Sequence, residues 1–555
     1  MKNILIINLA RFGDIVQTIP AVAGLREKYP GCRLTLMVND GFVDVCRVVP
    51  GVSRIVGIDF KRVYALMNGR GAGAMDAYGY LKRRFDELRA EKFDRIINLT
   101  PHDIGVLMTF LAGDDHAFWS HINGWTKYYL NITRDWRSLT LNVVDLFKRI
   151  AGIDGICPQI NLNVSKDAEN YADGILKTSG IQPGQPVIGL QGGASAIEKK
   201  WPGQHFVECA RLLAQKLNAG ILLFGAESDV AENRQIAAAV GPAAVNLAGR
   251  TTVEQLCAFM QRTDILVTND TGPMHIAAFC GTRVVCIHMG KEICETTGPY
   301  GSGNICLQPK LSCYPCDAPE NCLHRKCQAL IQPGDVFQAV LLLRGHQADS
   351  WSRQADPYIS VFDDAGTLDY VPLLKKKIDP ETFYRKVLRR VFDLALSENA
   401  TRPPISEISA TLCRLFEKYF DISEMASLTK DVKDNVALFE EMAVLAEQAL
   451  ARLSRLCALS TELQKNVHAI KQVSRSLDEI EARIVQLGTA TGRLAAIISL
   501  FKFEIESLKE KTVFGMAKES GFIYQQLKTR LETAMALMAC CLEINQKTFI
   551  KQKIA

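Results

Sequence analysis

The stretch that decides the fold is Asn3-Ile4-Leu5-Ile6-Ile7-Asn8-Leu9-Ala10-Arg11-Phe12-Gly13-Asp14, continued by Ile15-Val16-Gln17-Thr18-Ile19-Pro20. A short β-branched apolar run, a turn at Gly13 and a second apolar stretch predict a buried strand that passes directly into a helix. The run from Ile4 to Ala10 is too short, and too soon followed by charge, to be a signal peptide or a membrane anchor. We therefore expect it to be the first strand of a parallel sheet.

The same pattern repeats through the first 345 residues, where apolar runs alternate with amphipathic helical stretches and glycine-bearing turns. This alternation is typical of parallel sheets that are covered by helices on both faces. The expected strands are Asn3–Asn8, Arg33–Val38, Arg54–Ile58, Arg95–Leu99, Val187–Leu190, Gly220–Phe224, Ala244–Asn246, Ile265–Thr268 and Val284–Ile287. The polar, turn-rich stretch 158–186 separates them into two sets, which predicts two doubly wound α/β domains that are Rossmann-like.

Beyond residue 345 the composition becomes that of long helices, because few of the 39 glycines lie after residue 350 and no proline follows Pro404. A small hairpin is expected at Tyr358–Val361 and Leu368–Val371. Further on, apolar residues step by three and four, which indicates either a packing seam within a helical hairpin or a coiled coil between two copies. These residues are Val473, Leu477, Ile480, Ile484 and Leu487. The predicted domains are therefore 1–165, 166–345 and an all-α extension at 346–555.

The bulk composition excludes several classes of protein. The 555 residues are 48% hydrophobic and 23% charged, which rules out wholesale disorder and fits about three domains. Its 65 Lys and Arg against 60 Asp and Glu give a formal net charge of +5, too small a bias for a nucleic-acid-binding protein. No stretch approaches the roughly 20 apolar residues of a membrane span. The 17 cysteines fit a reducing compartment, so we expect a cytoplasmic protein, at most peripheral to the inner face of the cytoplasmic membrane.

Three loops carry residues suited to chemistry, and each follows a predicted strand, at the sheet edge where parallel sheets bind their ligands. In the first, Gly13 permits a tight turn and Asp14 lies at or near a helix N-terminus. Asp14 can be a helix cap, or a base that takes a proton from an acceptor hydroxyl. Both roles remain open at this point.

The second and third loops lie in the second domain. In the second, Gly192, Gly193 and Ser195 precede Lys199. The small residues let backbone N–H groups approach phosphate oxygens, and the lysine ammonium supplies positive charge to them. An ordinary strand-to-helix turn is the alternative. In the third, Asp270-Thr271-Gly272-Pro273-Met274-His275 opens a helix and forms a polar pocket suited to sugar hydroxyls and a diphosphate. His275 can contact phosphate or be a packed core histidine.

Together these loops resemble the heptosyltransferase family over roughly residues 1–343. The resemblance rests on Phe12-Gly13-Asp14 with Thr18-Ile19-Pro20-Ala21, on Asp270–His275, and on Thr297-Gly298-Pro299-Tyr300-Gly301. It implies a GT-B fold of two facing domains and an inverting transfer of heptose from ADP-heptose to the lipopolysaccharide inner core. The acceptor would be held mostly by the first domain and the donor by the second.

The resemblance also implies roles for individual residues. It places the catalytic base on Asp14, the phosphate-binding lysine on Lys199 and the acceptor contacts on Arg11 and Gly13. A ribose-binding acid would fall on Glu227 or Asp229, between which the sequence does not choose. The donor contacts are Gly193, Ser195, Glu227, Asp229, Asp270, Thr271, Gly272 and His275.

No catalytic metal is expected, because the sequence shows no Asp-x-Asp triplet placed to hold a diphosphate-bound cation. A separate group of cysteines has ligand-like spacing, which predicts a structural zinc site, with free thiols or disulfides as the alternative. These cysteines are Cys313, Cys316, Cys322 and Cys327.

The expected partners are a nucleotide-sugar donor, a lipid-linked saccharide acceptor and the inner membrane surface. Basic residues of the first domain, among them Lys61, Arg62 and Arg83, suit a phosphorylated lipid or an anionic membrane, or form a solvated face. A homo-oligomer through the C-terminal helices is a further candidate. Two other functions remain open: a nucleotide-sugar epimerase of the same fold, and a non-catalytic scaffold that binds a sugar nucleotide.

Overall fold

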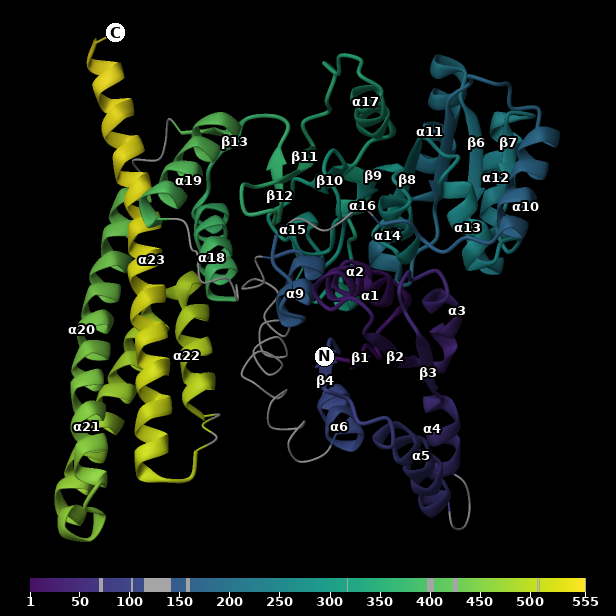
Figure 1. The fold of residues 1–555 in the computed structure, drawn as a ribbon. Coiled ribbons are helices and arrows are strands. Elements are labelled where there is room, and N and C mark those ends of the chain that lie inside the picture. Colours follow the sequence, from purple (N-terminus) through teal and green to yellow (C-terminus); the bar gives the residue numbers. More distant parts are fainter. Residues whose placement is uncertain are drawn as a thin grey trace. The chain divides into compact units, whose positions relative to one another are not determined.

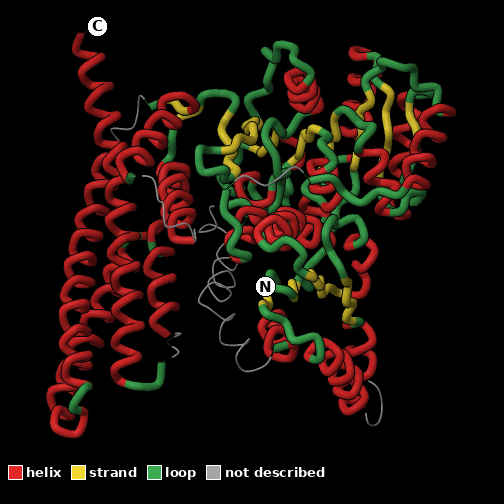
Figure 2. Tube along the Cα trace, in the orientation of Figure 1, coloured by secondary structure: helices red, strands yellow, loops and turns green. Residues whose placement is uncertain are grey.

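The computed structural model of the chain describes residues 1–68, 73–100, 103–113, 141–155, 160–316, 318–396, 404–422, 428–506, 508 and 510–554. The described residues form two compact units, one ending at Leu374 and the other beginning at Lys375. Figures 1 and 2 show alternating strands and helices in the first unit and an almost entirely helical second unit. The predicted division into α/β and all-α parts is confirmed.

The first sheet of the α/β unit has four parallel strands in the order β3-β2-β1-β4. They are β1 (Asn3–Ile7), β2 (Arg33–Asn39), β3 (Arg54–Ile58) and β4 (Arg95–Asn98). The helices around it are α1 (Phe12–Val16), α2 (Ile19–Lys28), α3 (Val43–Cys46), α4 (Phe60–Met67), α5 (Gly73–Arg89), α6 (Asp103–Ala112) and α9 (Val143–Ile150). Because β1 has a neighbour on each side, its residues from Ile4 to Ile7 are all buried, as the continuous apolar run predicts.

The second sheet has eight strands in the order β12-β11-β10-β9-β8-β5-β6-β7. The six parallel strands are β5 (Val187–Gln191), β6 (Gly220–Phe224), β7 (Ala244–Asn246), β8 (Ile265–Asn269), β9 (Arg283–Ile287) and β10 (Ile305–Pro309). Its helices are α10 (Lys166–Thr178), α11 (Gly203–Leu217), α12 (Val230–Val240), α13 (Val253–Met260), α14 (Gly272–Phe279), α15 (Cys294–Thr297), α16 (Cys327–Leu330) and α17 (Pro333–Leu343). Helices α11, α12 and α17 pack together, as do α10, α13 and α14, which gives the two helical layers of a doubly wound domain.

The predicted hairpin exists, but it belongs to the second sheet. Strands β11 (Ala355–Phe362) and β12 (Leu368–Pro372) pair antiparallel to each other, and β11 pairs antiparallel to β10. The α/β unit therefore extends beyond the predicted boundary at residue 345, and the helical part begins at Lys375. The antiparallel hairpin covers the edge that β10 would otherwise expose.

Helix α9 fastens the two halves of the α/β unit through buried polar groups. The Asp145 carboxylate accepts hydrogen bonds from the Tyr300 hydroxyl at 2.7 Å, from the Leu368 backbone N–H at 2.8 Å and from the Lys148 ammonium at 3.1 Å. The Asn142 amide donates to the Gly298 carbonyl at 3.2 Å. Since a buried charge is stable only when it is paired and hydrogen-bonded, this network fixes α9 against the loop at Gly298–Tyr300.

The helical unit contains α18 (Pro380–Leu396), α19 (Ile405–Tyr419), α20 (Thr429–Ser460), α21 (Leu463–Ala490), α22 (Ala496–Glu506) and α23 (Val513–Ile554), with short strands β13 (Lys376–Lys377) and β14 (Phe420–Asp421). Helix α20 packs along both α21 and α23. Val473, Ile480, Ile484 and Leu487 are buried within this unit, so the predicted seam packs inside one chain. Among the described helices, none combines the length and the hydropathy needed to cross a bilayer.

Candidate functional site

Asp14 lies in the first turn of α1, at the point where β1 ends. The N-cap residue of α1 is Arg11, and the Asp14 carboxylate accepts a hydrogen bond from the Arg11 backbone N–H at 2.9 Å. The buried side chain of Asn8 shapes the same turn, because its amide donates to the Asp14 carbonyl at 3.0 Å. Asp14 therefore has a structural role as the third residue of a capped helix, and this role leaves its carboxylate fixed in position.

The pKa of the Asp14 carboxyl lies above its ordinary value. Burial is the largest cause, and the Asp270 carboxylate acts in the same direction. The Arg11 N–H, the Arg11 guanidinium and the Lys199 ammonium act against it. A carboxylate with a raised pKa is a better proton acceptor than a solvated one, which suits it to general-base work.

Lys199 and Asp270 form an ion pair in the second domain. Lys199 ends a short turn after β5 and Asp270 follows β8, and the ammonium lies 2.8 Å from the carboxylate. A third residue, Glu292 in the loop after β9, lies 3.8 Å from the same ammonium. The structure thus brings together two of the predicted site residues and adds one that the sequence analysis missed.

The pKa values of Lys199, Asp270 and Glu292 depend on their burial and on the charges of one another. Burial alone would raise the pKa of Asp270, but Lys199 and then His288 outweigh it and hold the pKa at about 2. Burial lowers the pKa of Lys199, yet Asp270 and Glu292 bring it above its ordinary value. Burial raises the pKa of Glu292. The site therefore presents a fixed ammonium between two acids, one of which holds a proton more readily than a solvated glutamate does.

Helix α14 begins at the same place. Thr271 is its N-cap, and Asn269 joins the second and third loops, since its amide donates to the Gly192 carbonyl at 2.8 Å and its oxygen accepts from the Trp201 N–H at 3.1 Å. His275 is buried, and burial lowers its pKa to about 4, so the imidazole is neutral at pH 7. The open N–H groups of a helix N-terminus next to Lys199 make a site that attracts anions.

The two domains meet where α1 packs against α14, which also lie side by side in Figure 1. A Cβ at Gly272 would overlap the ring of Phe12, and a Cβ at Gly13 would lie 3.3 Å from the ring of His275. Glycine at these positions lets the two helices approach. This approach places the Asp14 loop of the first domain beside the Lys199–Asp270 pair of the second.

The remaining predicted donor residues lie along the second domain. Gly193 lies against the Asp229 carboxylate, where a Cβ would not fit. Asp229 accepts a hydrogen bond from the Ala226 N–H at 2.8 Å and so caps a turn, whereas Glu227 and Ser195 are exposed. Of the two candidate ribose-binding acids, Glu227 is the one whose carboxylate is more accessible.

The four cysteines of the predicted zinc site lie in the loop between β10 and α16 and at the start of α16. Burial raises the pKa of the Cys327 thiol, and the nearby thiols of Cys322 and Cys313 contribute. Zinc binding by these four cysteines remains a prediction. Within the described residues, three ligand atoms gather closely at another place, formed by Cys286, His288 and Cys306.

Residues 82–326 match the family model of glycosyltransferase family 9 (heptosyltransferase). Lipooligosaccharide heptosyltransferase 2 of Campylobacter jejuni is 31% identical over 166 residues, which cover 28% of this chain and 51% of that protein. Lipopolysaccharide heptosyltransferase 2 of Escherichia coli K12 is 26% identical over 306 residues, or 52% of this chain and 82% of that protein.

A solved structure extends the likeness to the fold. The glycosyl transferase family 9 protein from Veillonella parvula covers 62% of this chain and 97% of its own, with 20% sequence identity and a TM-score of 0.50. At this identity the likeness concerns the fold alone. The chain spans about half the length of the Campylobacter relatives that it matches.

Proposed function

We propose that this chain, whose residues 82–326 match the family model of glycosyltransferase family 9 (heptosyltransferase), transfers a heptose or a related sugar from ADP-heptose to a lipid-linked saccharide. The observation that carries the proposal is the meeting of α1 and α14. It brings one carboxylate with a raised pKa, Asp14, close to the partly buried Lys199 ammonium and a helix N-terminus. A base opposite an anion-binding site is the arrangement that glycosyl transfer from a nucleotide diphosphate requires.

Asp14 acts as the base in this proposal. Its carboxylate takes the proton of the acceptor hydroxyl while that oxygen bonds to the anomeric carbon, and the bond from this carbon to the diphosphate oxygen breaks. Attack from the face opposite the leaving group inverts the anomeric centre. Arg11 and Gly13 belong to the same turn, and in this proposal they contact the acceptor.

The second domain binds the donor. Lys199 and the N–H groups that open α14 at Thr271 and Gly272 stabilise the charge that develops on the departing ADP. Asp270 accepts hydrogen bonds from hydroxyls of the sugar and keeps Lys199 in place through the 2.8 Å ion pair. Glu227 contacts the ribose, while Gly193, Ser195 and Asp229 shape the loop beside it. His275 lies on α14 and packs as a neutral imidazole near Gly13. In this scheme the transfer needs no metal ion.

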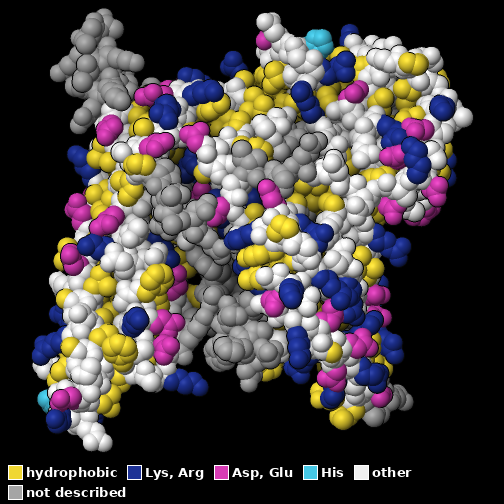
Figure 3. Space-filling model, viewed as in Figure 1, with side chains coloured by type: hydrophobic (Ala, Val, Ile, Leu, Met, Phe, Trp, Pro, Cys, Tyr) yellow, Lys and Arg dark blue, Asp and Glu magenta, His cyan; other side chains and the backbone are white. Residues whose placement is uncertain are grey.

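The acceptor side carries an exposed apolar and basic surface. Helix α4 has no buried residue, and Tyr64, Met67, Met75 and Tyr78 of α4 and α5 are 58–73% exposed. Exposed basic residues, including Lys61 and Arg83, lie on the same two helices. Figure 3 shows apolar side chains among basic and acidic ones over this part of the molecule, where Lys82 and Arg84 pair with Asp86 and Glu87. We propose that this α4–α5 surface contacts the anionic membrane that holds a lipid-linked acceptor, and that the enzyme works at the cytoplasmic face.

Two alternatives differ in what they require. An epimerase needs acid and base groups on both faces of a sugar, whereas Asp14 supplies a single base on the acceptor side. A scaffold would bind the nucleotide sugar through Lys199 and α14 without any use for a carboxylate of raised pKa. The position and pKa of Asp14 therefore favour transfer.

The first experiment is a thermal-shift panel with ADP, UDP, GDP, CMP and ADP-heptose, followed by a transfer assay with lipopolysaccharide-core acceptors. A ligand that binds only the folded state at about 100 times its Kd adds about 2.7 kcal/mol to the free energy of unfolding. We expect ADP and ADP-heptose to raise the melting temperature selectively. A preference for UDP or GDP would overturn the donor, binding without turnover would favour the scaffold, and conversion of the free nucleotide sugar without acceptor would favour the epimerase.

A further inference from the structure

Three side chains with soft or borderline donor atoms meet on one face of the second sheet. Cys286 lies on β9 and faces Cys306 on β10 in register. His288 follows two residues after Cys286, and its N–H donates to the Leu307 carbonyl at 2.9 Å, which continues the pairing beyond the end of β9. Because alternate residues of a strand share a face and paired residues lie side by side, the three side chains project together.

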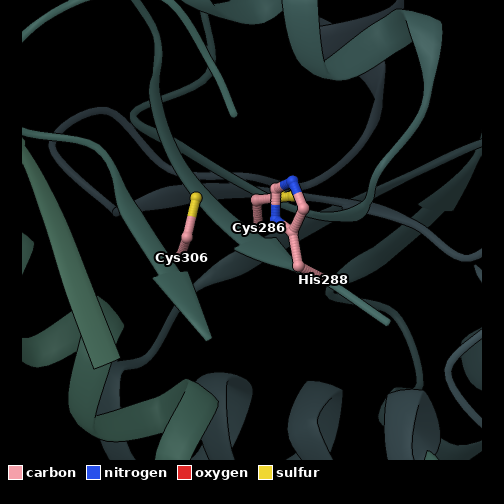
Figure 4. Close-up of side chains that lie close together, drawn as sticks. All are labelled: Cys286, His288 and Cys306. Carbon is pink, nitrogen blue, oxygen red and sulfur yellow. The ribbon is translucent and has the colours of Figure 1, made fainter. Parts of the chain in front are cut away.

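The ligand atoms of these residues are already close. One donor atom each of Cys286, His288 and Cys306 lies within 4.8 Å of the others (Figure 4). A tetrahedral zinc ion, with bonds of about 2.3 Å to sulfur and about 2.0 Å to nitrogen, holds its ligand atoms about 3.5 Å apart. Small rotations of the side chains would therefore close the group around an ion.

Burial gives an independent reason for a ligand here. All three side chains have no exposed surface, and the Nδ1 atom of His288 has no hydrogen-bond partner among the described residues. The other ring nitrogen, Nε2, lies 3.5 Å from the Thr297 hydroxyl. A buried polar atom without a partner destabilises the fold, and coordination to a metal would remove that cost.

We propose that Cys286, His288 and Cys306 bind a divalent transition metal of the zinc class. Two thiolates and a neutral imidazole balance the charge of such an ion, so the buried site carries no net charge. Binding releases the two thiol protons to solvent and involves no oxidation or reduction. The site is separate from the loop of Cys313, Cys316, Cys322 and Cys327.

The surroundings supply a further sulfur and polar support. Cys294, at the start of α15, hydrogen-bonds with Cys306, and the Gln308 amide donates to the Cys294 sulfur at 2.7 Å. Cys294 therefore supports Cys306 from outside the group of three, while its own thiol donates to the Glu295 carboxylate at 3.2 Å. The ion would lie beneath the donor site, since His288 already interacts with the charge of Asp270.

The test uses the full-length chain with all four loop cysteines changed to serine, so that only the buried group can bind. After reconstitution with Zn²⁺ or Co²⁺, metal analysis should give one ion per chain, and X-ray absorption should show a shell of two or three sulfurs with at least one imidazole nitrogen. Adding Cys306→Ser or His288→Gln should remove the ion, whereas Cys209→Ser, a buried cysteine of α11, should retain it.

Circular dichroism of each variant, which should match that of the unchanged chain, protects the test against variants that fail to fold, and spectroscopy is done on the chain in which only the four loop cysteines are serine. Co²⁺ bound by thiolates should give intense charge-transfer absorption and ligand-field bands of a tetrahedral site. A chain that takes up no ion after reconstitution, or a shell made of sulfur alone, would overturn the proposal. So would a Cys306→Ser protein that keeps its ion. These readouts do not depend on transferase activity.

Discussion

Among single residues, Asp14 allows the most specific test of the proposed activity. Asp14→Asn keeps an oxygen that can accept the Arg11 N–H but cannot take a proton. We expect the transfer rate to fall by about 10²–10⁴-fold while ADP still raises the melting temperature as in the wild type. Single-turnover assays with excess enzyme measure the first quantity and thermal shift the second. Normal transfer by the variant would remove Asp14 from the role of base.

The raised pKa of Asp14 also fixes the sign of two pH effects. As the pH falls through the raised pKa, the carboxylate takes up a proton, so transfer should decline at a pH above the ordinary aspartate value of 3.8. Because the folded pKa exceeds the unfolded one, ionisation of Asp14 lowers stability as the pH rises. Asp14→Asn should therefore leave the free energy of unfolding at pH 7 unchanged or higher, as urea titration can show.

The Lys199–Asp270 pair is tested by a double-mutant cycle. Lys199→Met leaves a buried carboxylate without its partner and should lower the free energy of unfolding by about 3–5 kcal/mol. The double variant Lys199→Met/Asp270→Leu should recover part of this loss. Since the folded pKa of Asp270 is about 2, the contribution of the pair is complete above pH 3.8 and is lost as the pH falls through about 2. Additive losses at pH 7 would show that the pair is not coupled.

The sequence could identify Asp14, Lys199 and Asp270 because each follows a predicted strand within a recognisable motif. It could not identify Glu292, since no local pattern marks this loop and its importance comes from a contact with Lys199, far away in the chain. The sequence could not predict the pairing of Cys286 with Cys306 for the same reason. It depends on which strands are neighbours, and twenty residues separate the two cysteines.

At the scale of elements, nine strands were predicted close to their observed bounds because most of them are buried apolar runs, although β7 is only half-buried. Strand β10 (Ile305–Pro309) was missed, since its sequence Ile-Cys-Leu-Gln-Pro is short and ends in proline. The hairpin of β11 and β12 was expected, but its attachment to β10 was not. Pairing at a sheet edge is set by tertiary neighbours and leaves little trace in local periodicity.

The contact of α1 with α14 depends on glycine at position 272. Gly272→Ala would place a methyl group in the ring of Phe12 and push the two helices apart. Since a shift of about 1 Å in a reacting group can lower a rate by about 10²-fold, we expect a loss of that order in transfer. Adding Phe12→Ala should restore part of the rate. Gly13→Ala, whose Cβ would lie 3.3 Å from His275, should lose less and serves as the matched comparison.

The α4–α5 surface predicts binding to anionic membranes. Full-length protein should sediment with vesicles that contain phosphatidylglycerol and much less with neutral phosphatidylcholine vesicles, and added salt should weaken the binding. Met67→Asp/Tyr78→Asp and Lys61→Glu/Arg83→Glu should each reduce it several-fold. Phe522→Asp, at a 67% exposed position of α23, is the control and should bind as the wild type. Equal binding to both kinds of vesicle would contradict the proposal.

At the scale of the whole molecule, the helical unit has its own interior. The apolar seam of α21 is buried against neighbouring helices of the same chain, so these residues are already engaged and do not offer a free face to a second copy. An oligomer, if light scattering of the full-length protein detects one, must use other residues. The helical unit is therefore a separate folded part with its own apolar interior.

Two truncations distinguish the observed boundary from the one that the sequence suggests. A fragment of residues 1–374 keeps β11 and β12, together with the bond from the Leu368 N–H to Asp145, and should melt cooperatively and respond to ADP as the full chain does. A fragment of residues 1–345 exposes the edge of β10 and leaves the buried Asp145 without one of its donors, so we expect it to aggregate or to melt at least several degrees lower. Calorimetry with and without ADP compares the two. If the shorter fragment is as stable as the longer one, the hairpin of β11 and β12 does not contribute to the stability of the sheet. The α/β unit then ends near residue 345, where the composition changes.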